Sequence, residues 1–222
     1  MLDTLFPRPL GDVGHPGTWA ASARMRVVVG VGPGHAVRTA DGLRAGPVLS
    51  AFGAAARELE DEGAEVITTS CGFLVLLQRE LQEQVNVPLV TSSLLQLPGL
   101  LAVESRVGVL TISAAKLGDD YLLAAGVPHE RMGDVVVQGV EPGGEFASAI
   151  LGNRETMDLR RAGAEVVAAA RALQARAPDL RSVVLECTNM PPYADAVRQA
   201  TGFELRSLLD DPALRLCVSG AV

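Results

Sequence analysis

The chain has 222 residues, enough for one or two domains that bury a hydrophobic core. It is 48% hydrophobic and 20% charged, which is typical of globular proteins and excludes a disordered or fibrous chain. The net charge is −7, so the chain lacks the basic excess that nucleic acids and anionic lipid surfaces attract. We therefore expect no nucleic-acid partner.

Cysteine usage and hydropathy indicate a soluble, cytoplasmic protein. Cys71, Cys187 and Cys217 lie far apart and form no CxxC pair, which argues against a structural zinc site and a disulfide framework. The apolar runs are far shorter than the roughly 18 residues of a membrane helix, and prolines interrupt the first 25 residues where a signal peptide would be apolar. We expect no metal and no membrane partner.

Residues 1–24 are predicted to form an arm, because glycine and proline are too frequent there for regular structure. Asp12 in this arm is expected to form an Asx turn, with binding of a substrate ammonium group as the alternative. His15 and His35 are isolated and are expected in loops, although His35 follows a predicted strand and is a weaker candidate for a base.

Residues 25–103 are predicted to form a first α/β domain. Short β-branched or apolar runs indicate its strands, and apolar residues at spacings of three and four indicate its helices. The predicted strands are 25–31, 65–69 and 87–90, and the predicted helices are 47–63, 73–84 and 93–103. Glycines at 30–34 lack the third position of a dinucleotide fingerprint, so no nucleotide cofactor is expected.

Residues 104–209 repeat the alternation and are predicted to form a second α/β domain. The predicted strands are 106–111, 134–138, 181–186 and 203–209, and the predicted helices are 114–125, 158–177 and 192–200, while 141–154 gives no clear pattern. A last helix near 212–217, within the segment 210–222, is expected to join the first domain. Continuous apolar strands alternating with helices predict parallel sheets covered on both faces.

Cys71 and Cys187 occupy equivalent places, because each follows a predicted strand and precedes a helix. Both then lie at the carboxyl edge of a parallel sheet, where ligands bind in open α/β folds. A helix N-terminus is expected to lower the pKa of each thiol, which would make both usable as acids or bases. A lone cysteine is usually just a small buried hydrophobe, and we expect that of Cys217.

Four segments resemble the aspartate/glutamate/hydantoin racemase superfamily, whose relatives include maleate isomerases and arylmalonate decarboxylases. They are Ile67-Thr-Thr-Ser-Cys-Gly-Phe-Leu74, Val87-Pro-Leu-Val-Thr-Ser-Ser93, Arg106-Val-Gly-Val-Leu-Thr111 and Val184-Leu-Glu-Cys-Thr-Asn-Met-Pro-Pro-Tyr193. The last is the most specific, because Cys-Thr-x-x-Pro after a strand is similar to the family's second catalytic cysteine motif. In the first, Cys71-Gly72-Phe73 replaces the usual Cys-Asn-Thr and removes polar neighbours that amino-acid racemases use.

The resemblance implies two pseudo-symmetric flavodoxin-like parallel-sheet halves, a site in the cleft between them, no cofactor and a homodimer. It makes Cys71 and Cys187 the catalytic acid/base pair. The substrate-binding residues that it implies are Ser70, Gly72, Thr111, Thr188 and Asn189, with Ser92 and Ser93 as weaker candidates. Serine and threonine at strand ends also cap helices, so a capping role remains open for each hydroxyl.

The expected activity is that of a cofactor-independent racemase or isomerase acting on a small carboxylate such as an amino acid or a derivative. Two thiols on opposite faces of a carbon can remove a proton from one side and return one to the other. A related decarboxylase or a maleate-type cis-trans isomerase is the alternative enzyme. A non-catalytic carboxylate-binding protein on the same fold is the alternative of another class.

Overall fold

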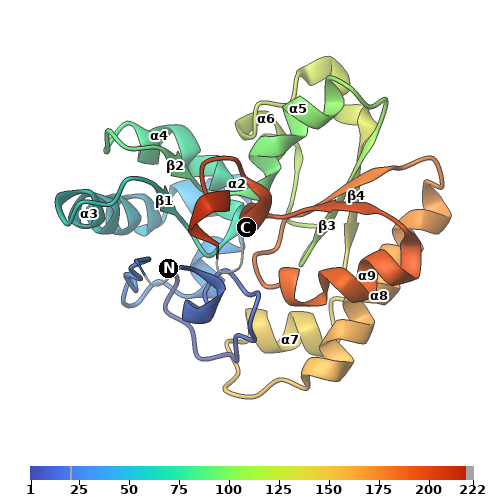
Figure 1. Ribbon diagram of the computed structural model, residues 1–222, viewed down its shortest axis with the longest axis horizontal. Helices are drawn as coiled ribbons and strands as arrows, with labels where there is room; N and C mark the ends of the chain where they lie inside the picture. Colours follow the sequence, from blue (N-terminus) through green and yellow to red (C-terminus); the bar gives the residue numbers. More distant parts are fainter. Residues whose placement is uncertain (21, 219–222) are drawn as a thin grey trace.

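Two groups of parallel strands divide the molecule into halves that lie side by side in the computed structural model, which describes residues 1–20 and 22–218 (Figure 1). The first half occupies the left of Figure 1 and the second half the right. Both sheets are parallel, which confirms the predicted α/β class.

The second half contains a four-stranded sheet in the order β4-β3-β5-β6. Its strands are β3 (Val107–Thr111), β4 (Val135–Gly139), β5 (Ser182–Leu185) and β6 (Glu204–Arg206). All five residues of β3 and all four of β5 are buried, as expected for strands covered on both faces. The strands run in the same direction, so their carboxyl ends meet at one edge of the sheet.

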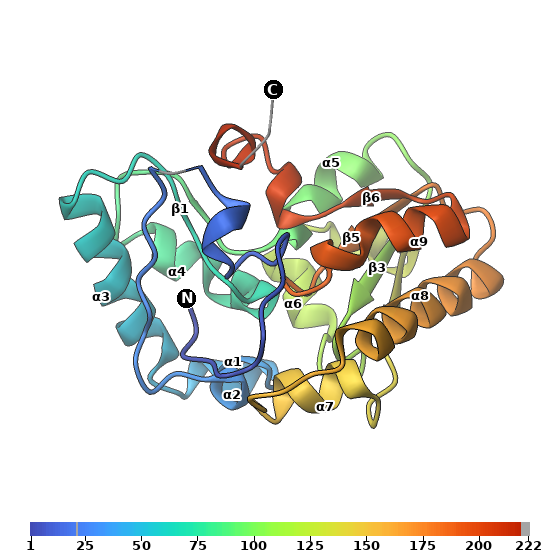
Figure 2. The ribbon, with the colours of Figure 1, turned by 60° about the horizontal axis from the view of Figure 1, so that its bottom comes forward.

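Helices cover both faces of this sheet. Helices α8 and α9 pack against it on one side, and α5 and α6 lie on the other (Figure 2). Asp158 begins α8 by accepting hydrogen bonds from the amides of Arg160 and Arg161, and Gly202 ends α9 in the left-handed conformation. Within the described part of the chain, no helix is both long and apolar enough to cross a bilayer. The helices of this half are α6 (Asp119–Ala124), α7 (Glu145–Leu151), α8 (Leu159–Arg176) and α9 (Ala194–Thr201), with 3₁₀ turns at His129–Asp134 and Pro191–Tyr193.

The first half has a smaller sheet, in which β1 (Ile67–Thr68) pairs with β2 (Leu89–Val90). The helix predicted over 73–84 is divided into a 3₁₀ segment, Gly72–Leu77, and α4 (Gln78–Gln82). The remaining elements of this half are α1 (Pro33–Ala36), α2 (Ala40–Arg44), α3 (Val48–Asp61), α5 (Leu97–Leu101) and the 3₁₀ segment Ser93–Gln96.

The strand predicted over residues 25–31 is wrong. Only Val28 pairs, through a single parallel bridge to Leu2, while the side chains of Val27 and Val29 are 43% and 84% exposed. The run is apolar, but it lies along the N-terminal arm instead of entering the β1–β2 sheet. Its backbone bonds go to the arm, from the Val28 amide to the carbonyl of Met1 and from the Asp3 amide to the carbonyl of Val31, and these two bonds form a bridge and not a strand of the sheet.

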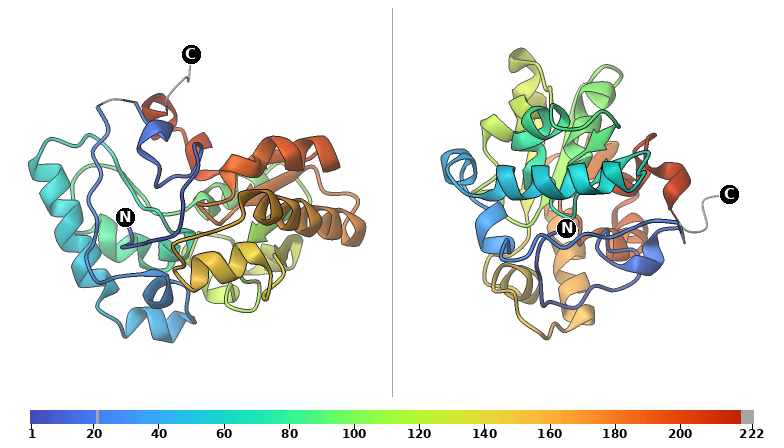
Figure 3. Two further views of the ribbon diagram at one scale, coloured as in Figure 1. Left: turned by 90° about the horizontal axis from the view of Figure 1, so that it is seen from below. Right: turned by 90° about the vertical axis from the view of Figure 1, so that its left-hand side faces the viewer.

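The arm and the C-terminal segment pack together on the first half (Figure 3). Trp19 and Val13 of the arm share a small hydrophobic cluster with Leu208 and Leu214, and the amide of Ala20 donates to the carbonyl of Cys217 at 2.7 Å. In place of the helix predicted at 212–217, the structure has the 3₁₀ turn Arg215–Cys217. Further 3₁₀ turns lie at Pro16–Thr18 in the arm and at Leu208–Asp210. The predicted segment 210–222 extends beyond the described residues after 218.

The two halves meet through the turns that follow β1 and β5. The Thr188 hydroxyl donates to the carbonyl of Ser70 at 2.7 Å. Gly72 lies so close to the second turn that a Cβ added there would be 2.3 Å from the carbonyl oxygen and from Oε1 of Glu186. This close approach requires glycine at position 72, because any side chain would separate the turns.

Substitution of Gly72 by alanine should therefore destabilise the protein by about 1–3 kcal/mol, the usual cost of overpacking a tight core. Urea denaturation measures the change, with Gly99→Ala as the control because nothing lies within 4 Å of a Cβ at that helical position. Equal stability of Gly72→Ala and wild type would show that the two turns separate without cost.

Candidate functional site

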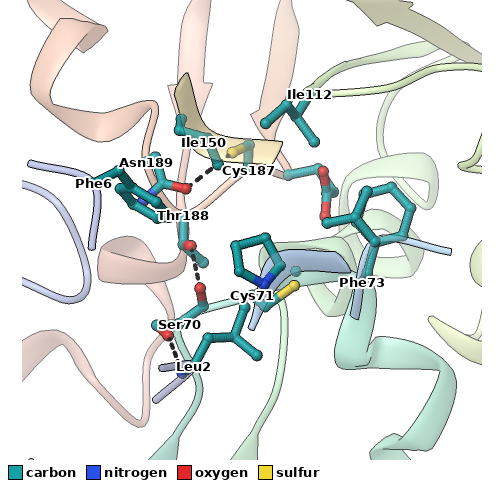
Figure 4. A pocket seen from close by; sticks show the side chains of 14 residues that line it. Leu2, Phe6, Ser70, Cys71, Phe73, Ile112, Ile150, Cys187, Thr188 and Asn189 are labelled. Atoms are coloured by element: carbon teal, nitrogen blue, oxygen red, sulfur yellow. Dashed lines mark hydrogen bonds between the residues drawn. The ribbon is translucent and has the colours of Figure 1, made fainter. Parts of the chain in front are cut away.

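A pocket opens at the junction of the halves, where the turns after β1 and β5 meet (Figure 4). Cys71 and Cys187 line it and are drawn on opposite sides of it, one from each half. Its empty volume, counted together with the solvent at its mouth, is about 340 Å³. Both cysteine side chains are only 6% exposed, so the pocket is nearly closed.

Cys71 stands at the start of the 3₁₀ segment that follows β1, where the backbone amides of Phe73 and Leu74 favour its thiolate. These amides lower its pKa, as predicted for a helix N-terminus. Burial and the nearby carboxyl of Glu186 act more strongly in the opposite direction and raise the pKa of Cys71 to about 12. The expected low pKa at this thiol is therefore wrong, because removal from water outweighs the hydrogen bonds.

Cys187 is held by a chain of hydrogen bonds that begins in the arm. Its sulfur donates to Oδ1 of Asn189 at 3.6 Å, and Nδ2 of Asn189 donates to Asp12 at 2.7 Å. Asp12, 1% exposed, also accepts from Arg8 at 2.7 Å. Burial, followed by the charge of Glu186, raises the pKa of Cys187 well above its ordinary value, so the low pKa predicted here is also wrong. The contacts keep Cys187 in its thiol form.

The arm forms the outer wall of the pocket and contacts both halves. Leu2 and Phe6 line the pocket, and the amide of Leu2 donates to the Ser70 hydroxyl at 3.0 Å. On the other side, the amide of Val13 donates to the carbonyl of Thr188 at 3.2 Å. The arm runs from the first half to the junction in Figure 2.

Four of the seven predicted substrate-binding residues line the pocket together with the two cysteines. These four are Ser70, Gly72, Thr188 and Asn189. Thr111 instead donates to Oε2 of Glu186 at 2.7 Å, Ser93 donates to the carbonyl of Leu185 at 2.8 Å, and Ser92 caps the turn at Leu94. Of the described residues, these three do not line the pocket, and the capping alternative describes Ser92.

The polar residues singled out near the arm have local roles as well. Asp12 accepts from the amide of Gly14 at 2.7 Å, which is the predicted Asx turn, and in addition it binds Asn189. His15 and His35 accept hydrogen bonds from the amides of Gly17 and Gly32. His15 lies in a loop as predicted, whereas the loop prediction for His35 is wrong, because this residue belongs to the short helix α1.

Glu186 is the site residue that sequence analysis missed. It lines the pocket, is 1% exposed, and has one carboxyl oxygen, Oε1, without a hydrogen-bond partner among the described residues. Burial raises its pKa to about 7, against the lowering effect of the Thr111 hydrogen bond. The sequence did contain a sign of this role: a charged residue ends the apolar run Val183-Val-Leu185 and immediately precedes Cys187.

Residues 1–20 and 22–218 contain no cluster of three or more histidine, cysteine, aspartate or glutamate side chains that could hold a metal ion. The pocket itself is lined by two thiols, one buried carboxyl group and the polar side chains of Ser70, Thr188 and Asn189.

Comparison with known proteins identifies relatives over most of the chain. A dimethylsulfoniopropionate lyase of Durusdinium sp. clade D is 30% identical over 93% of this chain and 72% of its own length. Dimethylsulfoniopropionate lyases 5 and 7 of Emiliania huxleyi (strain CCMP1516) are 32% and 30% identical over 90% of this chain, but over only 40% and 60% of their own lengths. No family model matches the chain.

Two solved structures share the fold. Arylmalonate decarboxylase is similar with a TM-score of 0.52 and 20% identity over 78% of each chain. Glutamate racemase from Aquifex pyrophilus is similar with a TM-score of 0.51 and 16% identity over 82% of this chain and 68% of that chain. At these identities the similarity concerns the arrangement of the two halves and not the reaction.

The racemase or isomerase activity expected from the sequence is wrong. The curated relatives are lyases at about 30% identity over most of the chain, whereas the racemase is similar in fold at 16% identity. The motifs that suggested a racemase belong to the shared scaffold, and one fold hosts several reactions. None of the curated relatives described above is called a decarboxylase, a cis-trans isomerase or a binding protein.

Burial should make the two pocket thiols less reactive than Cys217, although their positions at helix N-termini predicted the opposite order. With iodoacetamide at neutral pH, we expect Cys217, which is partly exposed, to be alkylated first. Asp12→Ala should accelerate alkylation of Cys187 about 10- to 100-fold, because it removes a buried charged hydrogen-bond partner that ties the arm to Asn189. Peptide mapping by mass spectrometry follows each thiol. Asp195→Ala, which removes an exposed ion pair, is the control, and an unchanged Cys187 rate in Asp12→Ala would contradict the closed arm.

Glu186 should make folding stability depend on pH. Its pKa is raised in the folded state from 4.5 to about 7, so folding favours the protonated form. Its contribution is therefore fully present below about pH 4.5, is lost as the pH rises to about 7, and then stays constant. Relative to Glu186→Gln, the free energy of unfolding of the wild type should fall by about 3 kcal/mol over this pH interval. Urea denaturation at a series of pH values tests this, and parallel curves for the two proteins would refute it.

Proposed function

We propose that the protein is a lyase that eliminates dimethyl sulfide from a propionate bearing a dimethylsulfonium group. The chain belongs to the dimethylsulfoniopropionate lyase family, within the aspartate/glutamate/hydantoin racemase superfamily. The relatives are enzymes, and their printed substrate is taken over here as part of the proposal. The observation that carries it is the unequal environment of the two pocket thiols.

In the proposed reaction, the Cys71 thiolate removes a proton from the carbon next to the substrate carboxylate. The electron pair of that C–H bond forms the carbon–carbon double bond, and the neighbouring C–S bond breaks. Its electrons leave with sulfur, so the sulfonium becomes neutral dimethyl sulfide and the remaining chain becomes acrylate. The Cys71 thiol then returns the proton to solvent.

Elimination needs one base, whereas racemisation needs one on each face of the carbon. Cys71 receives amide hydrogen bonds that favour its thiolate, and the charge of Arg8 acts in the same direction. Cys187 donates its proton to the Asn189 side chain, and burial and the charges of Glu186, Cys71 and Asp12 outweigh the lowering effect of the single Asn189 backbone amide on its pKa. This difference supports a single base at Cys71, with Cys187 remaining a hydrogen-bond donor.

The carboxylate end of the substrate is proposed to lie on the side of the pocket lined by Ser70, Thr188 and Asn189, as the sequence motifs suggested. Figure 4 shows these three residues on one side of the two cysteines, with Phe73 and Ile112 on the other. Gly72 belongs to the same turn as Ser70 and lets the backbone approach closely. A substrate lying across the pocket would then present its central carbons to the thiols.

The direct test is release of dimethyl sulfide from dimethylsulfoniopropionate by the purified chain, measured by gas chromatography, with acrylate followed by proton NMR. Cys71→Ser should lower kcat by about 10²- to 10⁴-fold, the usual contribution of a general base, because a serine hydroxyl is a far weaker base at neutral pH. Cys187→Ser should lose no more than about tenfold, because the hydroxyl still donates to Asn189.

Cys217→Ser serves as the control for loss of a thiol outside the pocket, and circular dichroism checks that each variant is folded. Formation of equal amounts of acrylate and dimethyl sulfide is the required stoichiometry. An equal loss of kcat in Cys71→Ser and Cys187→Ser would rule out the single-base assignment, and absence of dimethyl sulfide release from wild type would rule out the proposed function.

A further inference from the structure

Glu186 is a buried carboxyl group without a cation. Its Oε2 accepts from Thr111, and its Oε1 has no partner in the described part of the chain. None of the ion pairs among the described residues includes it, and Arg8 of the arm is bound to Asp12 at 2.7 Å. A charge removed from water is stable only when it is paired, so this carboxyl group leaves room for a positive partner.

The surroundings of Glu186 suit a cation that carries alkyl groups. Phe73 and Ile112 line the same pocket, and the Phe73 side chain is only 1% exposed with its ring packed edge-on against Tyr121 at 5.1 Å between centroids. Aromatic rings and apolar side chains accommodate methyl groups, and a ring face attracts a neighbouring positive charge. A strongly hydrated ammonium or guanidinium group would lose its water here without enough hydrogen-bond acceptors.

We propose that Glu186 binds the sulfonium end of the substrate and thereby selects small zwitterions that carry an alkylated cation at one end and a carboxylate at the other. This inference rests on the proposed function and adds the part of the site that recognises the leaving group. The two ends of such a molecule match the two sides of the pocket in Figure 4, where Phe73 and Ile112 lie opposite Ser70, Thr188 and Asn189.

Binding of a cation at Glu186 would also prepare the base. The charge of Glu186 raises the pKa of Cys71 and of Cys187, both of which line the same pocket. A positive charge beside Glu186 offsets this effect, so the pKa of Cys71 falls when the substrate is in place. An uncharged molecule of the same shape would leave the thiol protonated.

The test compares two unreactive probes by titration calorimetry on the full chain. One is a propanoate that carries a trimethylammonium group, and the other is its carbon isostere, in which a tert-butyl group replaces that cation. Wild type should bind the cationic probe about tenfold or more tightly than the isostere. Glu186→Gln should remove this preference while leaving affinity for the isostere unchanged or higher.

Glu104→Gln is the matched control. Like Glu186, which accepts from the Thr111 hydroxyl, Glu104 accepts a hydrogen bond from a hydroxyl group, that of Ser182 at 2.6 Å. Glu104 lies near the amino end of β5 and does not line the pocket. This control should keep the preference for the cation. A preference that survives Glu186→Gln overturns the inference, and so does a loss of kcat with unchanged affinity for the cationic probe, because Glu186 would then act as a base.

The two proposals fail in different ways. Binding of the probes requires no turnover, so a Glu186-dependent preference in a chain that releases no dimethyl sulfide would support the cation site and reject the lyase function. Lyase activity together with equal affinities for both probes would reject the cation site alone.

Discussion

A carboxyl group buried without a cation at the junction of two strand-end turns is the constraint on which the pocket depends. Glu186 can occupy this place only because position 72 is glycine and because Thr111 donates to one of its oxygens. Its charge then raises the pKa of both pocket thiols, so it influences every ionisable group that faces the ligand. The residue whose burial costs the most free energy is therefore also the one whose charge shifts the pKa values of the pocket thiols.

Much of the second half could be predicted from the sequence, because its elements are formed by local patterns. The apolar run before Glu186 predicts β5 and so places Cys187 at the edge of the sheet, and the residues of the long helix predicted over 158–177 form α8. The first half was harder. The run 25–31 is as apolar as a buried strand, yet its pairing depends on Leu2 of the arm, and no local pattern reports such a contact.

The candidate site shows the same limit. Both cysteines and four of the predicted polar residues follow from their positions at strand ends, whereas the bond from Asp12 to Asn189 spans 177 residues and has no local sign. The pKa values of the thiols depend on how completely the arm excludes water, which composition does not reveal. The replacement of Cys-Asn-Thr by Cys71-Gly72-Phe73 departs from amino-acid racemases, and so does Asn189, where glutamate racemases carry histidine.

Two cysteines at equivalent strand ends do not by themselves define a two-base enzyme. The environment decides whether each thiol can ionise, and here the amides of Phe73 and Leu74 favour one sulfur while Asn189 holds the proton of the other. A symmetric scaffold can thus support an asymmetric reaction, because hydrogen bonds and neighbouring charges differ between its halves.

The sequence separation between the parts of the pocket also determines when it forms. Ser70 meets Thr188 across 118 residues, and Asp12 meets Asn189 across 177, so both contacts must wait until almost the whole chain has been synthesised. Contacts between such distant residues also form late in folding, because closing a long loop costs entropy before it is rewarded. The four-stranded sheet needs β6 at residues 204–206 as well, so the sheet and the pocket are both completed only when the last part of the chain is available.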